Sequence, residues 1–383
     1  MPAHAGPNIL GESNLVFAYD TGDASNSYIG EPTVNVATNA PTRDGWPGSY
    51  TLVDSNTKTF NLTTTTIPWG GGDSWCMFHY DVTAYIGSNI TISGTFEVID
   101  QSTGQFSWLM LGQPIVGQTY LGYSSEVDRL YKATSTKEKI SWSGIANGSG
   151  KVGLTMWMTN GASGYLTVRL SNVQVEVKSH VTPFVNGTRS ATQGLLPVIG
   201  NSTIDLTNVS FDSSAKMVFD GTDDYISIPT YTFGNGNWTL NMLINANDFA
   251  NFNLMSNTSG GPVTNAFGAY SSKIFYYNYD GSWQSHSGNT TLSTGTWYML
   301  TWVNYAGATA NLGTMQMFVN GIADSSVFNS YTTNGGPCNA IGANWYPSSF
   351  NGKIDVVQIY NKSLTAQEIK QNYQQYKTRF NLS

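Results

Sequence analysis

The feature of this chain that most constrains its fold is a period-two alternation of apolar and polar residues, which recurs in short segments. The alternation is clearest at residues 90–98, 152–158 and 166–177, and turns rich in Gly, Asn and Ser separate such segments. This pattern predicts β-strands with one face buried and the other face in water. Before residue 365 no window of useful length has a helical pattern. We therefore predict an all-β chain that folds as two antiparallel β-sandwiches.

Composition excludes several classes of protein. Charged residues make up 11% of the 383 residues, against ~25% in an average soluble protein. No stretch approaches the ~20 consecutive apolar residues that a membrane-spanning helix needs, and the aromatic content of 13% is too high for a disordered chain. Residues 191–352 carry two basic side chains against eight acidic ones, within a net charge of −7. Nucleic-acid binding needs a basic surface, so we expect neither membrane insertion nor nucleic-acid binding.

The cysteines and the N-terminus add two further expectations. Cys76 and Cys338 lie far apart and have no CxxC spacing, so no zinc site is expected and both are interpreted as unpaired thiols. The first residues contain neither a basic segment nor an apolar segment of the kind found in secretory leaders. We therefore expect no signal peptide, and synthesis in the cytoplasm of the producing cell.

The chain is predicted to divide into four segments. Residues 1–33 form an N-terminal arm with a first strand, and residues 34–180 form a β-sandwich. Residues 181–194 form a linker, because its proline and glycine interrupt the alternation. Residues 195–383 form the second sandwich, which ends in a short helix.

The helix is predicted from its start signal. Thr365 and Glu368 have the spacing of a capping box. Ile369, Tyr373 and Tyr376 then form an apolar stripe, so this helix is expected to pack against the edge of the sandwich.

Three motifs in the second sandwich resemble one superfamily. Residues 219–226 read FDGTDDYI, residues 238–241 read WTLN, and residues 350–369 read FNGKIDVVQIYNKSLTAQEI. Their order and spacing resemble those of the laminin-G-like, concanavalin-A-like jelly-roll superfamily. The resemblance covers about half of the chain and implies a lectin-like jelly roll.

Other segments resemble virion proteins of tailed phages. Residues 15–20 and 28–35 are similar to the opening of phage structural proteins that carry such a jelly roll. Residues 173–176 and 182–190 resemble a segment that, in phage tail and fibre proteins, follows a sandwich like that of carbohydrate-binding modules. The resemblance implies that residues 34–180 form such a sandwich. It also suggests that the strand at 15–20 belongs to the C-terminal jelly roll, with the middle sandwich inserted.

Three carboxylates in one turn suggest a metal site. Asp220, Asp223 and Asp224 would repel one another unless a cation or hydrogen bonds intervened. Calcium prefers several oxygen ligands, and the resemblance implies calcium near this loop, with Asp355 as a further ligand. The alternative is a turn in which the Asp side chains accept hydrogen bonds from backbone amides.

Catalytic residues are not expected. A glycosidase needs two suitably spaced carboxyl groups, yet residues 191–352 contain no Glu and the Glu-x-Asp-x-x-Glu strand of the related glucanases is absent. None of the four histidines lies in a recognisable nucleophile setting. We therefore expect a protein that is not an enzyme.

Aromatic clusters beside Asn, Asp and Gly are the better functional signal. Sugars bind to such surfaces through ring stacking and a few fixed hydrogen bonds. Alternatively, these rings lie in the core or in protein–protein interfaces, where Tyr and Trp are also enriched. The candidate carbohydrate-binding residues are Tyr277, Tyr279, Trp283, Trp345, Tyr346, Trp69 and Trp75.

Together these observations indicate a phage virion structural protein with a lectin-like domain. It would act in host-surface glycan adhesion as a tail-fibre or receptor-binding component on the particle surface, with other virion proteins and a host polysaccharide as partners. A homo-oligomer, with a trimer as one option, is expected. The alternatives are a capsid decoration protein without a specific glycan, and a polysaccharide depolymerase.

Overall fold

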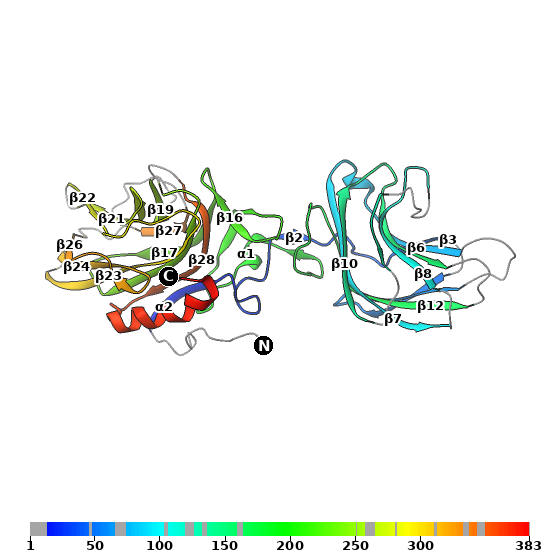
Figure 1. Ribbon diagram of the computed structural model, residues 1–383, viewed down its shortest axis with the longest axis horizontal. Helices are drawn as coiled ribbons and strands as arrows, with labels where there is room; N and C mark the ends of the chain where they lie inside the picture. Colours follow the sequence, from blue (N-terminus) through cyan, green and yellow to red (C-terminus); the bar gives the residue numbers. More distant parts are fainter. Residues whose placement is uncertain are drawn as a thin grey trace. The chain divides into compact units, whose positions relative to one another are not determined.

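In the computed structural model the chain forms two compact units, each described here by itself (Figure 1). The C-terminal unit comprises residues up to Glu31, Ser190–Asp212 and the chain from Lys216 onward; the middle unit comprises Pro32–Arg189 with Ser213–Ala215. The predicted all-β class is confirmed. The structure describes residues 14–45, 48–65, 74–102, 106–118, 126–131, 136–158, 164–249, 251–256, 265–279, 282–309, 312–331, 337–342 and 349–382.

Two antiparallel sheets form the C-terminal unit. In the described ranges the larger sheet has the order β15 (Ser210–Phe211), β16 (Met217–Asp220), β28 (Asn351–Tyr360), β18 (Trp238–Ala246), β23 (Trp297–Thr309), β24 (Leu312–Val319), β25 (Ile322–Ala323). Two further strands belong to this sheet: β1 (Leu15–Asp20) pairs with β28, and β26 (Phe328–Tyr331) pairs with β24. The second sheet has the order β14 (Asp205–Asn208), β17 (Tyr225–Thr232), β27 (Pro337–Ile341), β19 (Asn251–Ser256), β20 (Asn265–Tyr270), β21 (Lys273–Tyr279), β22 (Trp283–Ser287).

Aromatic side chains fill the space between these two sheets. Trp302 of β23 and Phe267 of β20 are both fully buried, and their ring centroids lie 5.7 Å apart in an edge-on arrangement. The indole N–H of Trp302 donates to the carbonyl oxygen of Phe275 on β21 at 3.0 Å. A buried Trp thus joins the two sheets by packing and by a hydrogen bond that satisfies its polar atom.

The first strand of the chain belongs to the C-terminal unit. β1 pairs antiparallel with the last strand, β28, with Phe17 opposite Ile359 and Tyr19 opposite Val357. Phe17 and Tyr19 are fully buried in the core of this unit. This is the arrangement that the hypothesis of an inserted middle sandwich predicts.

The segment predicted as a linker is divided between the units. β13 (Thr188–Arg189) pairs with β2 (Thr33–Val34), so the strands that enter and leave the middle unit lie side by side. The middle unit therefore extends to Arg189 rather than ending at residue 180. After it, the four-residue helix α1 (Ala191–Gly194) begins at Ser190, which forms a capping box with Gln193.

Helix α2 (Ala366–Phe380) buries the other face of the larger sheet. The predicted capping box is confirmed, because Thr365 accepts from the Glu368 amide and Glu368 reaches back to the Thr365 amide. The predicted stripe, Ile369, Tyr373 and Tyr376, is buried. The helix continues beyond Tyr376 to Phe380, whose ring lies 4.7 Å from that of Trp297. Strand β18 is consequently buried along both faces.

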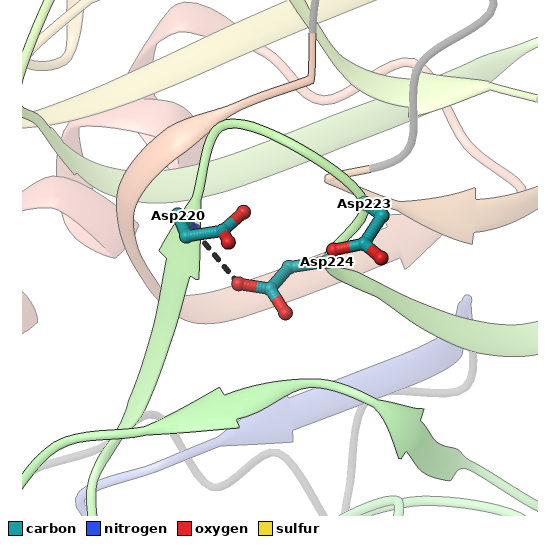
Figure 2. Close-up of side chains that lie close together, drawn as sticks. All are labelled: Asp220, Asp223 and Asp224. Atoms are coloured by element: carbon teal, nitrogen blue, oxygen red, sulfur yellow. Dashed lines mark hydrogen bonds between the residues drawn. The ribbon is translucent and has the colours of Figure 1, made fainter.

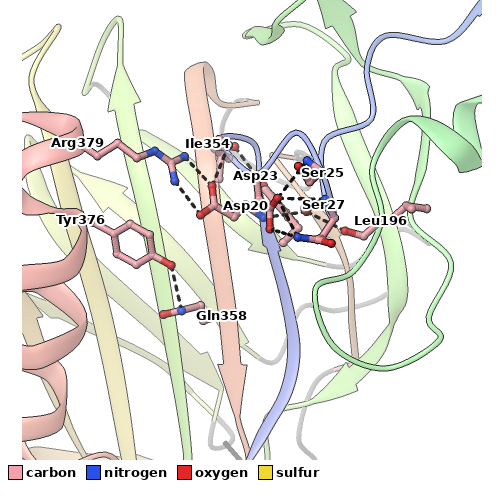
Figure 3. Close-up of polar contacts among 12 residues, drawn as sticks. Asp20, Asp23, Ser25, Ser27, Leu196, Ile354, Gln358, Tyr376 and Arg379 are labelled. Atoms are coloured by element: carbon pink, nitrogen blue, oxygen red, sulfur yellow. Dashed lines mark hydrogen bonds and ion pairs between the residues drawn. The ribbon is translucent and has the colours of Figure 1, made fainter. Parts of the chain in front are cut away.

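An ion pair connects the end of α2 to the end of β1 (Figure 3). The guanidinium of Arg379 donates two hydrogen bonds to the carboxylate of Asp20, at 2.8 and 2.6 Å. Nearby, the hydroxyl of Tyr19 donates to the carbonyl of Ile354, and the amide of Gln358 donates to the hydroxyl of Tyr376. The two hydrogen bonds between Arg379 and Asp20 fix the orientation of the end of α2 as well as contributing charge attraction.

The middle unit is a second sandwich, as predicted. One sheet, within the described ranges, has the order β10 (Glu138–Ile145), β7 (Asn89–Gln101), β12 (Tyr165–Glu176), β5 (Thr59–Thr65), β4 (Gly48–Asp54). The other has the order β3 (Thr42–Gly45), β6 (Ser74–Asp81), β11 (Lys151–Met158), β8 (Phe106–Gln113), β9 (Glu126–Tyr131).

Neither cysteine is in a disulfide bond, and both are buried, each in a different unit. Burial raises the pKa of the Cys76 thiol to about 11 and that of Cys338 to about 12, which keeps both protonated and unreactive. No helix in the described part of the chain has the length and apolar character needed to cross a membrane.

Candidate functional site

The turn that joins β16 to β17 brings three carboxylates together (Figure 2). One carboxylate oxygen each from Asp220, Asp223 and Asp224 lies within 4.8 Å of the others. Gly221 permits the turn because its φ of 84° lies in the left-handed region, which favours glycine. We call Asp220, Asp223 and Asp224 the acidic turn.

Asp224 serves mainly to hold the turn in place. Its side chain is buried, and its Oδ1 accepts hydrogen bonds from the amide and the hydroxyl of Ser210, both at 3.0 Å. Its Oδ2 accepts from the amide of Asp220 at 2.7 Å. Burial raises the pKa of Asp224, and the nearby charge of Asp220 acts in the same direction, whereas these hydrogen bonds oppose the rise. Oδ2 keeps one further acceptor position.

Asp220 and Asp223 are exposed. Asp220 Oδ1 accepts from the amide of Thr222 at 2.7 Å, which is the local turn contact that was the alternative to metal binding. Asp223 makes no hydrogen bond with any residue in the described part of the chain. The acidic turn therefore combines one buried anchor with two carboxylates that still have acceptor capacity for a cation.

Polar residues of β28 and of the segment before it lie next to the turn. The hydroxyl of Ser349 donates to the carbonyl of Thr222 at 2.9 Å, and the side chain of Asn247 donates to that of Asn351 at 2.7 Å. Asn351 also pairs with Asp220 across β28 and β16. Ser210 and Ser349 were not predicted from the sequence, because their contacts join segments that are distant along the chain.

Asp355 does not join the acidic turn, which corrects the set of four ligands expected from the resemblance. Asp220 pairs with Asn351, and Asp355 lies four residues farther along β28, a distance of about 13 Å at the rise of a strand. Its neighbours are Asp20 and Arg379. The pKa of Asp355 is raised, chiefly because burial disfavours its charged form.

The predicted aromatic residues do not gather around the acidic turn. Tyr277 is half-buried on β21, with its ring stacked on that of Phe275 at 5.7 Å and 25°. Four strand spacings separate β21 from β17, or about 19 Å. Trp75 is half-buried on β6 of the middle unit.

The other aromatic predictions have no described side chain. Tyr279 and Trp283 are opposite each other in the backbone pairing of β21 and β22, and their side chains lie outside the described residues. Trp69, Trp345 and Tyr346 lie wholly outside the described residues.

One family model matches part of the chain. Residues 220–370, less than half of the chain, match the model of the Concanavalin A-like lectin/glucanases superfamily. No curated protein matches the chain.

Several solved structures share a distant likeness. Domain 4 of AbnA, an extracellular arabinanase from Geobacillus stearothermophilus, in complex with arabinotriose, is 16% identical, with a TM-score of 0.35, over 46% of this chain and 89% of that chain. A heptameric SAP-like pentraxin from Limulus polyphemus is 16% identical, with a TM-score of 0.32, over 40% and 78%. The binding domain of botulinum neurotoxin serotype D is 15% identical, with a TM-score of 0.36, over 48% and 49%.

The matched region begins at Asp220 in the acidic turn and ends at residue 370, in the first part of α2. Over residues 220–370 this chain therefore carries a jelly-roll domain with the concanavalin A-like lectin fold.

Proposed function

We propose that this protein is a non-enzymatic adhesin whose lectin-like domain binds a glycan with the help of calcium at the acidic turn. The observation that carries the proposal is the acidic turn itself, at the opening of the lectin-like region. Asp220 and Asp223 supply exposed carboxylates, and Asp224 supplies one remaining acceptor position. Hydroxyl groups of a sugar can complete the coordination of a calcium ion, since calcium accepts six to eight oxygen ligands.

The geometry favours binding over hydrolysis. Glycosidases use one carboxyl as a proton donor and a second as nucleophile or base. Asp224 has the raised pKa that a proton donor needs, but its oxygens accept three hydrogen bonds from Ser210 and Asp220, which orient them into the protein. Release of reducing ends from a polysaccharide by the purified protein, lost on Asp224→Asn, would show instead that the protein is a depolymerase.

The setting we propose is the surface of a tailed-phage particle. The support is the resemblance of residues 15–20, 28–35, 173–176 and 182–190 to segments of phage structural proteins. The adhesin would be a homo-oligomer, so that weak individual sites act together on a glycan-covered surface. Mass spectrometry of particles produced from the encoding genome should detect the protein; particles that lack it would contradict the proposal.

Calcium binding is the first testable consequence. Asp223→Ala is expected to weaken calcium binding by about tenfold or more, because it removes a charged ligand from a small ligand set. Folding should be unaffected, since Asp223 is exposed and makes no hydrogen bond with a described residue. Calorimetric titration measures the affinity for calcium. A glycan array with calcium or with EGTA measures whether glycan binding depends on calcium.

The matched control is Asp248→Ala, which removes an exposed carboxylate of the same unit outside the acidic turn. It should leave calcium affinity unchanged. Equal loss in both variants, or a wild-type protein that binds no calcium, would contradict the assignment of the site to the acidic turn.

A further inference from the structure

Strand β4 lies at one edge of the sheet β10, β7, β12, β5, β4 in the middle unit. Within the described ranges it pairs with β5 and with no second strand, so one side of its backbone has no partner strand. An edge strand of this kind presents a row of backbone N–H and C=O groups that can pair with a strand of another chain. The side chains of β4 decide whether such pairing is prevented or favoured.

Three large apolar side chains of β4 are exposed. Tyr50, Leu52 and Val53 are 43%, 50% and 48% exposed. Tyr50 lies opposite Leu62 on β5, and Leu52 lies opposite Phe60, and both of these partners are buried in the core of the middle unit. Residues that lie opposite each other in an antiparallel sheet point to the same face. Tyr50 and Leu52 therefore extend the core to the edge of the sandwich, where they remain in contact with water.

The other edge strands of the middle unit are charged. Charged side chains on an edge strand are a common means of preventing association with other chains. In the described sheets the edge strands β10, β3 and β9 carry, respectively, Glu138 and Lys139, Arg43 and Asp44, and Glu126, Asp128 and Arg129. Residues 48–53 of β4 carry no charge, and the one acid of the strand, Asp54, lies at its end. Among these four edges, β4 is therefore the one that lacks this protection.

We propose that β4 is the surface through which two copies of this chain associate, by antiparallel pairing of one β4 with the other. The pairing would join two five-stranded sheets into one continuous sheet. Centred on Thr51, it places Tyr50 opposite Leu52 of the second copy, and Leu52 opposite Tyr50 of the second copy. Aromatic and aliphatic side chains in such cross-strand positions stabilise a sheet. Here they would also cover the apolar groups that β4 exposes.

The charge distribution of β4 favours a second copy of the chain as the partner. About a twofold axis the same strand lies on both sides, so strand length and apolar positions match. The two copies of Asp54 then lie at opposite ends of the pair, so no like charges meet. Val53 lies at an irregularity of the pairing between β4 and β5, which confines regular pairing to the uncharged part of the strand.

Association through β4 does not depend on the acidic turn, which lies in the other unit. It gives a surface to the homo-oligomer of the proposed adhesin, and it makes the assembly formed by the middle unit a dimer. An oligomer that forms through another surface would leave the proposed adhesin function standing and would contradict the role of β4.

The first test measures the mass of the full-length protein in EGTA, by size-exclusion chromatography with light scattering. The wild-type protein should approach twice the 41.6 kDa of one chain as its concentration rises to about 100 μM, above the micromolar dissociation constants of weak interfaces. Leu52→Lys should remain monomeric over the same range, because it places a charge near the centre of the edge. Folding should be retained, since the Leu52 side chain is half exposed.

The matched control is Ile145→Lys. Ile145 lies at the end of β10, the opposite edge of the same sheet, and its side chain is 60% exposed. The same substitution there should leave the dimer intact. Hydrogen exchange of middle-unit peptides shows whether each variant is folded.

Cysteine cross-linking tests the register. Thr51→Cys should form a disulfide between two copies under mild oxidation, because Thr51 lies opposite Thr51 of the second copy at the twofold axis. Cys76 and Cys338 are buried and should not compete. Ile145→Cys is the control and should remain a single chain on a non-reducing gel.

A wild-type protein that is monomeric at every concentration would overturn the proposal and leave β4 to a strand of a different protein. A dimer that survives Leu52→Lys, or that Ile145→Lys dissociates equally, would overturn it as well. Equal cross-linking of Thr51→Cys and Ile145→Cys would contradict the pairing of β4 with itself. These outcomes do not bear on the calcium site.

Discussion

Phe17→Ala is expected to lower the free energy of unfolding of the C-terminal unit by about 3–5 kcal/mol, the usual cost of truncating a buried Phe. The ring is fully buried in the core of that unit. It lies edge-on to Tyr19 with centroids 6.3 Å apart, and 5.5 Å from the ring of Tyr231 on the facing sheet. The substitution therefore leaves a cavity between the two layers and weakens the contact between the first strand and the last.

Because the chain has two units, an unfolding curve of the whole protein would not show which unit lost stability. Hydrogen exchange followed by mass spectrometry reads each unit separately, and peptides of β28 and β18 should lose protection while those of β7 and β12 keep theirs. The control is Val16→Ala in the same strand, whose side chain is 37% exposed and should cost less than about 1 kcal/mol. Loss of protection in the middle unit alone would show that β1 does not stabilise the C-terminal unit.

The second large effect is expected at Glu176, where Glu176→Ala should destabilise the middle unit by about 3 kcal/mol, as for the loss of one member of a buried charged network. The Glu176 side chain is fully buried. Its carboxylate accepts hydrogen bonds from the hydroxyl of Thr33 at 2.8 Å, and from the amide and hydroxyl of Thr182 at 3.1 and 2.5 Å. The buried Arg189 donates to Thr182 Oγ1 and to the carbonyl of Pro183.

Removal of the Glu176 carboxylate would leave the buried donors of Thr33 and Thr182 without this acceptor. Chemical denaturation monitored by exchange of middle-unit peptides measures the loss. Glu97→Ala is the matched control, because Glu97 pairs with Arg169 at 3.4 Å on the exposed face and such pairs contribute about 0–1 kcal/mol. If Glu97→Ala and Glu176→Ala proved equally mild, the buried network would not hold the strands that enter and leave the middle unit.

The features that local sequence determines were predicted well. The start of α2 depends on Thr365 and Glu368, three residues apart, so its capping box could be read directly. Strands in the alternating segments were predicted because the side-chain period of a strand is a property of its own backbone. The acidic turn was predicted because its three carboxylates lie within five residues of one another. The alternation of apolar and polar residues did not show that α2 covers the outer face of β18, which is buried on both faces.

Contacts between distant segments were harder to predict. The sequence suggested that β1 joins the C-terminal unit only through resemblance, and its pairing with β28 spans more than 330 residues. The prediction that Asp355 joins the acidic turn was wrong, because a resemblance in sequence does not show how far along a strand a residue lies from a neighbouring turn. Thr182 and Arg189, which share a hydrogen-bond network with Glu176, lie where a linker was predicted, since proline and glycine mark turns but not the unit to which a turn belongs.

The sequence by itself determined the all-β class, the order of the two sandwiches, the terminal helix and the acidic turn. Each of these follows from the periodicity, capping or spacing of neighbouring residues. Only the tertiary structure decided the partners of β1 and the separation of Asp355 from the acidic turn. Both depend on the register of β28 against β1 and β16, and a shift of one residue would turn the side chains of β28 to the opposite face. Register is set by packing across the whole sheet, so no single segment contains it.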